Sequence, residues 1–476
     1  MGSKWTFKSL NELGVQLIDC MHKTPSAQVT GVPYIGIPQM KNGEIDFEAS
    51  PRLISESDYK LWTEKANPQY GDIILSRRCN PGETAFVSGQ TQFALGQNLV
   101  ILRTNGLSIT AEYLRWALNS SYWWDEVEKY KNPGAIFDSL KCGDIPNFQI
   151  PAPPLRIQNK ISSVLDLLTD RINLSNKVNK TLEQISQTLF KSWFVDFDPV
   201  IDNALDAGNP IPEALQSRAE LRQKVRNSEN FKPLPADIRI LFPAEFEEMA
   251  LGLIPKGWKF SNVNSLLKNT IGGDWGSDSE DEKHTTQAVI VRGTDIPELI
   301  SGKLSSAPYR WVEPKKLEKR RINVGDIIIE VSGGSPTQST GRSIFMTEQI
   351  IDRLGGVIEP ASFCRKFEPL SVELGLIISL HLSKIYNDGK MWEYQNQSTG
   401  IANFQTKYFL EAEQIVIPSV QVINAFYRIV MPWIEKSHNN EQIILGNLRD
   451  TLLPKLISGE LSLEDLPDLV TQTEPA

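Results

Sequence analysis

Cysteine is scarce in this chain, which has four among its 476 residues. Cys20, Cys79, Cys142 and Cys364 lie far apart and never form a Cys-x-x-Cys pair. This spacing argues against a disulfide framework and against a zinc knuckle, and it is typical of a protein in a reducing cytoplasm.

Long hydrophobic runs are missing too. No stretch of about 18 uncharged apolar residues occurs, and the first residues lack the apolar core of a secretory signal. We therefore expect no membrane segment and a cytoplasmic location. With 40% hydrophobic and 22% charged residues the composition is ordinary for a globular protein. At about 100–200 residues per domain, the length predicts two to four domains.

The motifs of common catalytic centres are absent. The glycine-rich stretch 333–343 lacks the lysine and the spacing of a phosphate-binding loop, and Gly-x-Ser-x-Gly does not occur. The four histidines have no metal-ligand spacing to one another or to the cysteines. The acidic residues of 274–282 stand among Gly and Ser, which is typical of a solvated loop. We therefore predict no catalytic activity, no metal and no cofactor for this chain.

The formal net charge of −9 has the wrong sign for a protein that coats DNA. Acidic residues concentrate in 196–250, whereas 151–195 is basic. A locally basic face therefore remains open to a nucleic-acid role.

Four landmarks recur in one order at a nearly constant separation of roughly 250–270 residues, which indicates a duplicated plan. The pairs are Trp5 to Leu13 with Trp258 to Leu266, Gly71 to Ile74 with Gly325 to Ile328, Gln149 to Pro151 with Val416 to Pro418, and Thr188-Leu189 with Thr451-Leu452. In each copy, Gly-Asp followed by β-branched residues predicts a turn that enters a strand. We therefore predict two similar α+β globules.

A helical segment follows each globule. Residues 155–195 contain no Pro or Gly. A series that is apolar except at Ser175 recurs there every seven positions, and the seam beside it drifts from Leu165 and Ile172 to Val178 and Ile185. Pro432 is expected to kink or break the second segment. The two stripes predict an antiparallel coiled coil, with packing of each helix on its own domain as the alternative. The predicted seam residues are Ile161, Leu168, Leu182, Leu189, Ile423, Val430, Ile444 and Leu448.

These patterns divide the chain into six parts. The stretch 199–254 is acidic and punctuated by proline, so we expect a surface connector rather than a core, with a short helix from Glu213 to Arg226. The parts are a globular domain at 1–150, a central helix at 151–198, the connector at 199–254, a second globular domain at 255–417, a C-terminal helix at 418–460 and an acidic tail at 461–476.

Recognition chemistry is what the sequence offers in place of catalysis. Arginine pairs bidentately with guanine or binds phosphate, amide side chains pair with adenine edges, and dense basic runs bind phosphates. For each residue the alternative is an ordinary solvated surface charge. The candidates for DNA binding are Arg77, Arg78, Gln90, Gln92, Asn98, Arg292, Lys315, Lys316, Lys319, Arg320, Arg321 and Arg342.

The layout resembles the specificity subunit of type I restriction–modification systems over nearly the whole chain. The stretches that carry the resemblance include an Ile-Pro-x-Pro-x-Leu-x-x-Gln run from Ile150 and a closing Leu-Leu-Pro-Lys-Leu-Ile-Ser-Gly run from Leu452. The second copy departs from the pattern at 419–422, where its helix is expected to begin. The other matching stretches are 71–76, 189–199 and 253–258.

This resemblance implies that the two globules are target-recognition domains, each reading one half of an asymmetric, bipartite double-stranded DNA site. The two domains and their helices would form a pseudo-twofold repeat, in which the helices make an antiparallel coiled coil. This coiled coil would dock two methyltransferase subunits, and restriction subunits would join that complex. S-adenosylmethionine and ATP with Mg²⁺ would belong to those partners. A duplicated coiled-coil scaffold without a DNA role is the alternative, and the negative net charge is its best argument.

Overall fold

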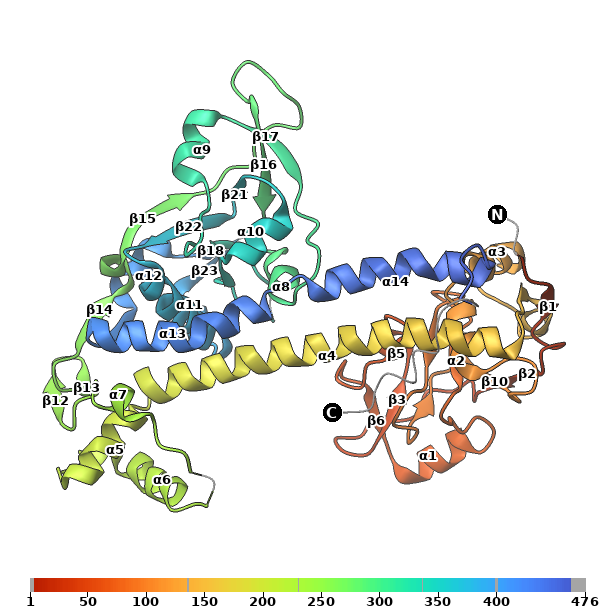
Figure 1. The fold of residues 1–476 in the computed structure, drawn as a ribbon, viewed down its shortest axis with the longest axis horizontal. Coiled ribbons are helices and arrows are strands. Elements are labelled where there is room, and N and C mark those ends of the chain that lie inside the picture. The colour runs from red at the N-terminus through yellow and green to blue at the C-terminus, as the bar shows by residue number, and fades with distance from the viewer. Residues whose placement is uncertain (1–3, 135–136, 230, 336, 399–400, 464–476) are drawn as a thin grey trace. The chain divides into compact units, whose positions relative to one another are not determined.

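The computed structural model describes residues 4–134, 137–229, 231–335, 337–398 and 401–463 (Figure 1). The chain forms two compact units, Met1–Arg171 with Leu445–Ala476 (unit 1) and Ile172–Ile444 (unit 2). Helix α4, Leu155–Phe194, and helix α14, Glu441–Ser458, each contribute residues to both units. Unit 1 is thus built from two separate stretches of sequence, whereas unit 2 is continuous.

The described residues of unit 1 form three sheets and three short helices besides the unit's share of α4 and α14. The sheets have the strand orders β2-β10-β7-β8-β5-β4, β6-β3-β9 and β1-β11. The strands are β1 Phe7–Ser9, β2 Val15–Asp19, β3 Val32–Ile35, β4 Met40–Lys41, β5 Glu44–Ile45, β6 Arg52–Ile54, β7 Ile73–Ser76, β8 Thr84–Phe86, β9 Ala94–Leu95, β10 Leu99–Thr104 and β11 Gln149–Pro151. The helices are α1 Glu56–Thr63, α2 Ala111–Ala117 and α3 Ser121–Tyr130.

Unit 2 contains sheets with the orders β15-β22-β18-β20, β17-β16-β21, β14-β25, β19-β24-β23 and β12-β13. Its strands are β12 Phe246–Met249, β13 Gly252–Pro255, β14 Lys259–Asn262, β15 Leu267–Gly272, β16 Thr286–Val291, β17 Tyr309–Val312, β18 Ile327–Glu330, β19 Ser332–Gly333, β20 Ser343–Phe345, β21 Ile358–Pro360, β22 Cys364–Pro369, β23 Gln395–Ser398, β24 Ile401–Phe404 and β25 Gln414–Ile417. Its helices are α5 Asp198–Ala207, α6 Gln216–Arg226, α7 Ala236–Arg239, α8 Ile296–Ile300, α9 Pro314–Arg320, α10 Glu348–Leu354, α11 Val372–Asn387, α12 Thr406–Ala412 and α13 Val420–Ser437.

The two units repeat one topology. Strands β2, β10, β7 and β8 pair antiparallel in that order, as do β15, β22, β18 and β20. In each unit a second sheet joins one antiparallel and one parallel neighbour to a central strand, β3 in unit 1 and β16 in unit 2. The strand that opens each repeat pairs with the strand that closes it, β1 with β11 and β14 with β25. The predicted pair of similar α+β globules is therefore confirmed.

The repeated Gly-Asp landmark is a buried turn. Gly71 and Gly325 have φ angles of 86° and 90°, a left-handed conformation that favours glycine. The following aspartate accepts the backbone N–H of the residue three positions earlier, at 2.7 Å in both units. Asp72 also pairs with Arg103 at 2.7 Å, and Asp326 with Lys366 at 3.0 Å. Equivalent aspartates in the two copies thus make equivalent contacts, one with a backbone N–H and one with a cation.

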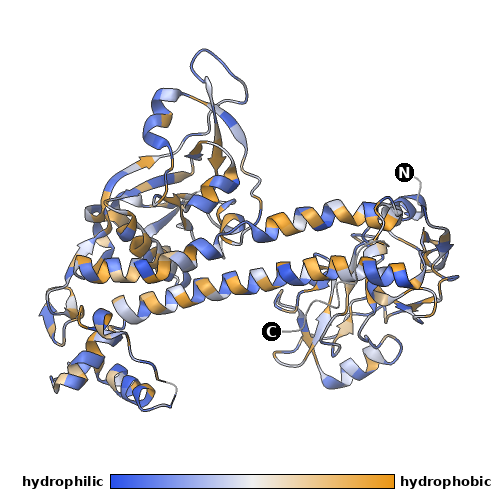
Figure 2. Cartoon of the chain, in the orientation of Figure 1, coloured by the Kyte–Doolittle hydropathy of each residue, from blue (hydrophilic) through white to orange (hydrophobic). Residues whose placement is uncertain are grey.

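The strand that follows the landmark is buried on both faces, which explains its uninterrupted apolar sequence. In β7, Ile73 and Leu75 join one hydrophobic core and Ile74 joins another. In β18, Ile327 and Ile329 face one core and Ile328 faces a second. Figure 2 shows that α4, by contrast, carries both hydrophilic and hydrophobic residues along its length.

Helix α4 and the C-terminal helices run antiparallel in unit 2, because Ser175 lies against Gln442 and Phe190 lies against Phe426. Of the predicted seam, Ile161, Ile423 and Val430 are buried, and Leu168, Leu182 and Leu189 are partly buried. The drift of the seam toward Val178 and Ile185 is wrong, since both are exposed. Polar side chains occupy the buried positions of this stretch instead: Ser175, Asn179 and Ser186.

Ile444 and Leu448 do not line the predicted seam, since they are 63% and 45% exposed. The helical phase is interrupted before them, because α13 ends at Ser437 and α14 begins at Glu441. Arg353 stabilises the break between the two helices by donating to the carbonyl oxygens of His438 and Asn439. The helix is not broken at Pro432, which lies inside α13 among the buried residues Val430, Met431 and Ile434. Core packing there outweighs the roughly 3 kcal/mol cost of an internal proline.

The stretch 199–254 is more than a surface connector. Its helix α5 buries Val200, Ile201 and Ala204, and Phe242 joins the same unit's core. The predicted helix before Arg226 is present as a 3₁₀ turn followed by α6. Three arginines of α6 pair in register with three aspartates of α5, so much of the acidic charge is compensated locally: Arg218 with Asp198, Arg222 with Asp202 and Arg226 with Asp206.

Glu183 gives unit 2 a predicted pH dependence. Its side chain lines a groove of about 630 Å³ beside Leu376 and His438, and burial raises the pKa of its carboxyl from 4.5 to about 7. Because the pKa of this carboxyl is higher in the folded than in the unfolded state, the free energy of unfolding falls as pH rises from about 4.5 to 7. We expect the free energy of unfolding, measured with urea, to fall less between pH 5 and pH 8 in Glu183→Gln than in the wild type. The exposed Glu411→Gln should keep the full decline, and an unchanged slope in Glu183→Gln would contradict the prediction.

Among the helices of the described residues, none combines the length and the apolar character needed to cross a membrane.

Candidate nucleic-acid interface

The sheet of unit 1 brings three loops to one edge. Strand β2 ends at Asp19 beside Val100, and β7 ends at Ser76 beside Leu99, where β10 begins. The loops that follow β2 and β7 and the loop that precedes β10 therefore meet. We call this surface the strand-end edge of unit 1; it consists of residues 19–22, 77–80 and 97–98.

Arg77 is held in place at this edge. Arg77 is only 9% exposed, and its Nη2 lies 3.1 Å from His22 Nδ1. His22 Nδ1 also lies 3.0 Å from the Gln97 carbonyl oxygen, so the ring tautomer decides whether Nδ1 accepts from Arg77, with the hydrogen on Nε2, or donates to that carbonyl. His22 Nε2 lies 2.9 Å from Asp19 Oδ2. The chain Arg77–His22–Asp19 fixes the orientation of the guanidinium, while Arg77 Nε is buried and has no partner in the described part of the protein.

Arg78 is the accessible cation of the edge. It is exposed, and no ion pair joins it to another described residue. Asn98 lies at the same edge, where its carbonyl oxygen accepts the Arg77 N–H at 3.0 Å. Gln90 and Gln92 are exposed in the loop between β8 and β9, where Gln90 Nε2 donates to the Gln92 carbonyl oxygen at 3.4 Å.

Sequence reasoning missed His22 and Asp19, although they complete this site. The ligand atoms of Asp19, Cys20 and His22 lie within 4.8 Å of one another, as in a metal site. However, burial raises the pKa of the Cys20 thiol to about 11, and the thiol is 3.3 Å from the Gly96 carbonyl oxygen. With the Arg77 cation also bonded to His22, the donor set disfavours a metal ion and favours a hydrogen-bonded support for Arg77.

The corresponding edge of unit 2 carries different chemistry. Strand β18 ends at Glu330 beside Cys364, where β22 begins. Glu330 receives a bidentate pair from Arg342 at 2.9 and 2.6 Å. Arg292 likewise forms a bidentate pair with Asp295, at 3.0 and 2.7 Å. Both arginines are therefore neutralised inside the unit, which the sequence pattern did not indicate.

Helix α9 presents the basic run of unit 2 at the surface. Leu317 is buried and anchors the helix. Lys316 pairs with Glu313 at 2.7 Å, and Arg320 pairs with Asp274 at 2.6 Å. Three cations are exposed and have no ion pair within the described residues: Lys315, Lys319 and Arg321. We call these three the basic face of α9.

An open groove of about 540 Å³ lies at the strand-end edge of unit 2. Its walls come from the loops after β15 and β16, from the end of β18 and strand β19, and from the loop between β21 and β22. We call it the aromatic groove; it is lined by Trp275, Arg292, Gly293, Thr294, Glu330, Ser332, Gly333, Ala361, Ser362 and Phe363.

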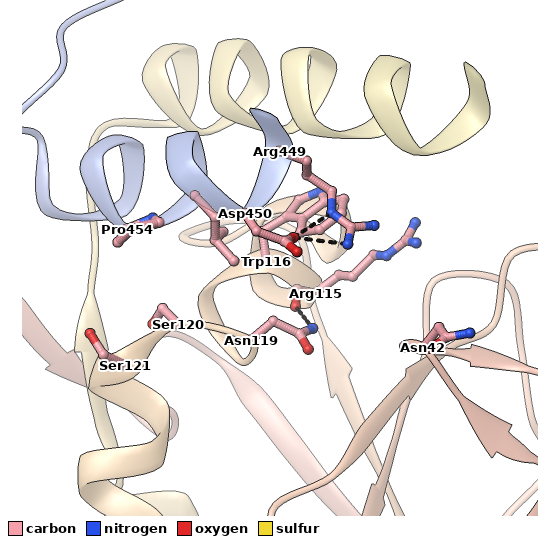
Figure 3. A pocket seen from close by; sticks show the side chains of 11 residues that line it. Asn42, Arg115, Trp116, Asn119, Ser120, Ser121, Arg449, Asp450 and Pro454 are labelled. Atoms are coloured by element: carbon pink, nitrogen blue, oxygen red, sulfur yellow. Dashed lines mark hydrogen bonds and ion pairs between the residues drawn. The ribbon is translucent and has the colours of Figure 1, made fainter. Parts of the chain in front are cut away.

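A second hollow, of about 520 Å³, lies in unit 1 between α2, the start of α3 and α14 (Figure 3). Figure 3 shows the Arg449 guanidinium turned back onto Asp450, to which it donates at 2.9 Å. Arg115 is paired with Glu44 at 2.5 Å. Because both cations are compensated, we assign this hollow to the packing of α14 on unit 1.

Comparison with known proteins adds to this geometry. Residues 2–184 match the family described as "Type I restriction modification DNA specificity domain". The chain is 24% identical over 469 residues to the type I restriction enzyme MjaIX specificity subunit of Methanocaldococcus jannaschii, covering 97% of this chain and 94% of that protein. It is 24% identical over 416 residues to the HindI specificity subunit of Haemophilus influenzae, covering 82% of this chain and 86% of the relative.

Among solved structures, the chain resembles the S subunit of a type I restriction–modification system from M. genitalium. The TM-score is 0.54 at 15% identity, and the match covers 95% of this chain and 96% of the other. At this identity the likeness establishes the shared fold.

Proposed function

Because this chain belongs to the specificity subunits of type I restriction–modification systems, we propose that its two units read the two halves of an asymmetric, bipartite DNA site. The observation that supports this proposal is that the strand-end edge of unit 1 and the corresponding edge of unit 2 carry different side chains. After the repeated Gly-Asp strand, unit 1 has Arg77 and Arg78, whereas unit 2 has Val331 and Ser332. One scaffold that presents two different sets of side chains suits two different half-sites.

Exposed apolar side chains on α4 support docking of methyltransferase subunits. Leu174, Val178 and Ile185 follow helical spacing on one side of the part of α4 that belongs to unit 2, and all three are exposed. Such a stripe in a soluble protein is typical of a surface that another helix covers. On this proposal, the partners contribute S-adenosylmethionine and ATP with Mg²⁺, restriction subunits join the complex, and the chain itself is non-catalytic and acts in the cytoplasm.

A map of adenine methylation in the source cell, with and without this gene, tests the function. We expect deletion to abolish methylation at a single two-part motif with unequal halves. An unchanged map in a cell that expresses the methyltransferase subunits would contradict the proposal. The alternative of a scaffold without a DNA role finds no support in the family match.

The basic face of α9 predicts a salt-dependent contribution to DNA binding. Replacing Lys315, Lys319 and Arg321 by alanine should weaken binding to all duplexes about equally, because interactions with phosphates carry no sequence information. The slope of log K against log salt should become shallower by about one for each phosphate that is no longer neutralised, hence by up to about three. The comparison uses the assembled methyltransferase at several salt concentrations.

The exposed Lys303 and Lys407, replaced together by alanine, serve as the control for loss of charge elsewhere on unit 2. A variant of the basic face that changes the preferred sequence while keeping the salt slope would show that these residues read bases instead.

A further inference from the structure

The aromatic groove exposes large apolar side chains at a position where unit 1 exposes the cation Arg78 and amide side chains. Phe363 is 64% exposed and Trp275 is 39% exposed. The backbone of Phe363 is fixed all the same, because its carbonyl oxygen accepts the N–H groups of Val331 and Ser332. The ring is therefore held outward on an ordered loop.

The charges that line the groove are neutralised within unit 2. Glu330 is paired with Arg342, and Arg292 with Asp295. A side chain at position 293 would collide with this arrangement, since a Cβ there would lie 2.4 Å from Glu330 Oε1. The surface that remains consists mainly of hydrocarbon and hydroxyl groups, contributed by Thr294, Ala361 and Phe363 among others.

The flank of the groove is cationic. Asp274 precedes Trp275 of the groove wall and binds Arg320, the last residue of α9. This ion pair connects the helix that carries the basic face to the wall of the groove. The Arg310 guanidinium, which is paired with Asp278, lies 4.8 Å from the centroid of the Trp275 ring and adds no free charge to this flank. An apolar centre beside exposed cations is complementary to duplex DNA, whose phosphates are anionic and whose major groove carries one hydrocarbon group.

We propose that the aromatic groove reads the C5 methyl groups of thymine in the half-site of unit 2. This inference rests on the proposed function and adds the chemical feature that the unit recognises. Thymine is the only base that presents a methyl group in the major groove, and Phe, Ala and the Thr methyl are the side chains that contact it. The Arg77–Arg78 edge of unit 1 suits acceptor atoms of bases, so the two half-sites are read by different chemistry.

The test removes single methyl groups from the DNA. Once the site is known, each of its thymines is replaced in turn by uracil, which keeps the base pairing and lacks only the C5 methyl. Binding of each duplex to the assembled methyltransferase is measured by fluorescence anisotropy. We expect at least one replacement in one half-site to weaken binding roughly fourfold, the loss for one buried methyl group.

Phe363→Ala identifies the side chain responsible. In this variant the same thymine-to-uracil replacement should have no further effect, since the ring that would touch the methyl group is already absent. The matched control is Leu370→Ala, which truncates an exposed apolar residue beyond the other end of β22 and should keep the fourfold loss. Truncating either exposed side chain leaves the core of the unit intact.

The outcomes separate this inference from the function on which it rests. Sequence-specific binding without any loss on methyl removal would overturn the inference alone, as would a loss that persists undiminished in Phe363→Ala. A complex that prefers no DNA sequence would overturn the proposed function as well.

Discussion

A methyltransferase assembled with Arg78→Ala should lose specificity at one base pair of one half-site. Arg78 is exposed at the strand-end edge of unit 1 and has no ion pair among the described residues, so its guanidinium is available to DNA. A bidentate arginine contact to guanine O6 and N7 is worth about 1–3 kcal/mol of discrimination. We therefore expect a roughly 5- to 150-fold loss of preference for guanine at that position, with the other half-site unaffected.

Methylation rates on a panel of duplexes measure this effect. In each duplex one guanine is replaced by 7-deazaguanine, which lacks the N7 acceptor. The wild-type complex should discriminate against one such duplex, and the Arg78→Ala complex should not. Lys60→Ala, which removes an exposed cation on α1, is the control and should behave like the wild type. If Arg78→Ala retained full discrimination, the strand-end edge of unit 1 would not be its reading surface.

Asp72→Ala should destabilise unit 1 more than any surface variant. The Asp72 carboxylate is 1% exposed, accepts two hydrogen bonds from Arg103 at 2.7 Å and accepts the Gln69 N–H. Removing the carboxylate leaves the Arg103 guanidinium without its counter-charge and the Gln69 N–H without its acceptor. Breaking a buried ion pair in this way costs about 3–5 kcal/mol, a large part of the stability of one domain.

Hydrogen exchange resolves this loss by unit. We expect the amides of β7 and β10 to lose protection, while those of β18 and β22 keep it. Asp326→Ala should produce the reverse pattern, because Asp326 occupies the same turn in unit 2. Asp72→Asn retains an acceptor and should have a smaller effect. Equal loss of protection in both units would show that the turns do not act independently.

The regular elements were predictable because local sequence determines them. The β-branched residues after Gly71 and Gly325 form the central strands β7 and β18, and the stretch without Pro or Gly forms the 40-residue helix α4. Which face of α4 is buried was not predictable. Apolar spacing marks Val178 and Ile185, yet the structure buries Asn179 and Ser186 and leaves the apolar residues outside. Periodicity defines the faces of a helix, whereas the packing partners decide which face is covered.

The candidate site was predictable only in part for a related reason. The sequence places Arg77 and Arg78 after a strand, but the support of Arg77 comes from His22, which is 55 residues away. Arg292 and Arg342 looked equally available, yet each has a carboxylate partner that only the folded chain supplies. Whether an arginine is free to bind DNA depends on its ion pairs, and these are set by tertiary structure.

The discontinuity of unit 1 has a consequence for biosynthesis. Leu456 and Ile457 are fully buried in the core that contains Leu10 and Ile161, and the Lys4 N–H donates to the Ser458 carbonyl oxygen at 2.8 Å. Unit 2 needs no residue beyond Ile444. On the ribosome, unit 2 can therefore complete its fold while unit 1, although translated first, still lacks part of its core. We expect nascent chains that stop before Leu456 to expose apolar surface of unit 1, which makes the closure of this unit the last step of folding.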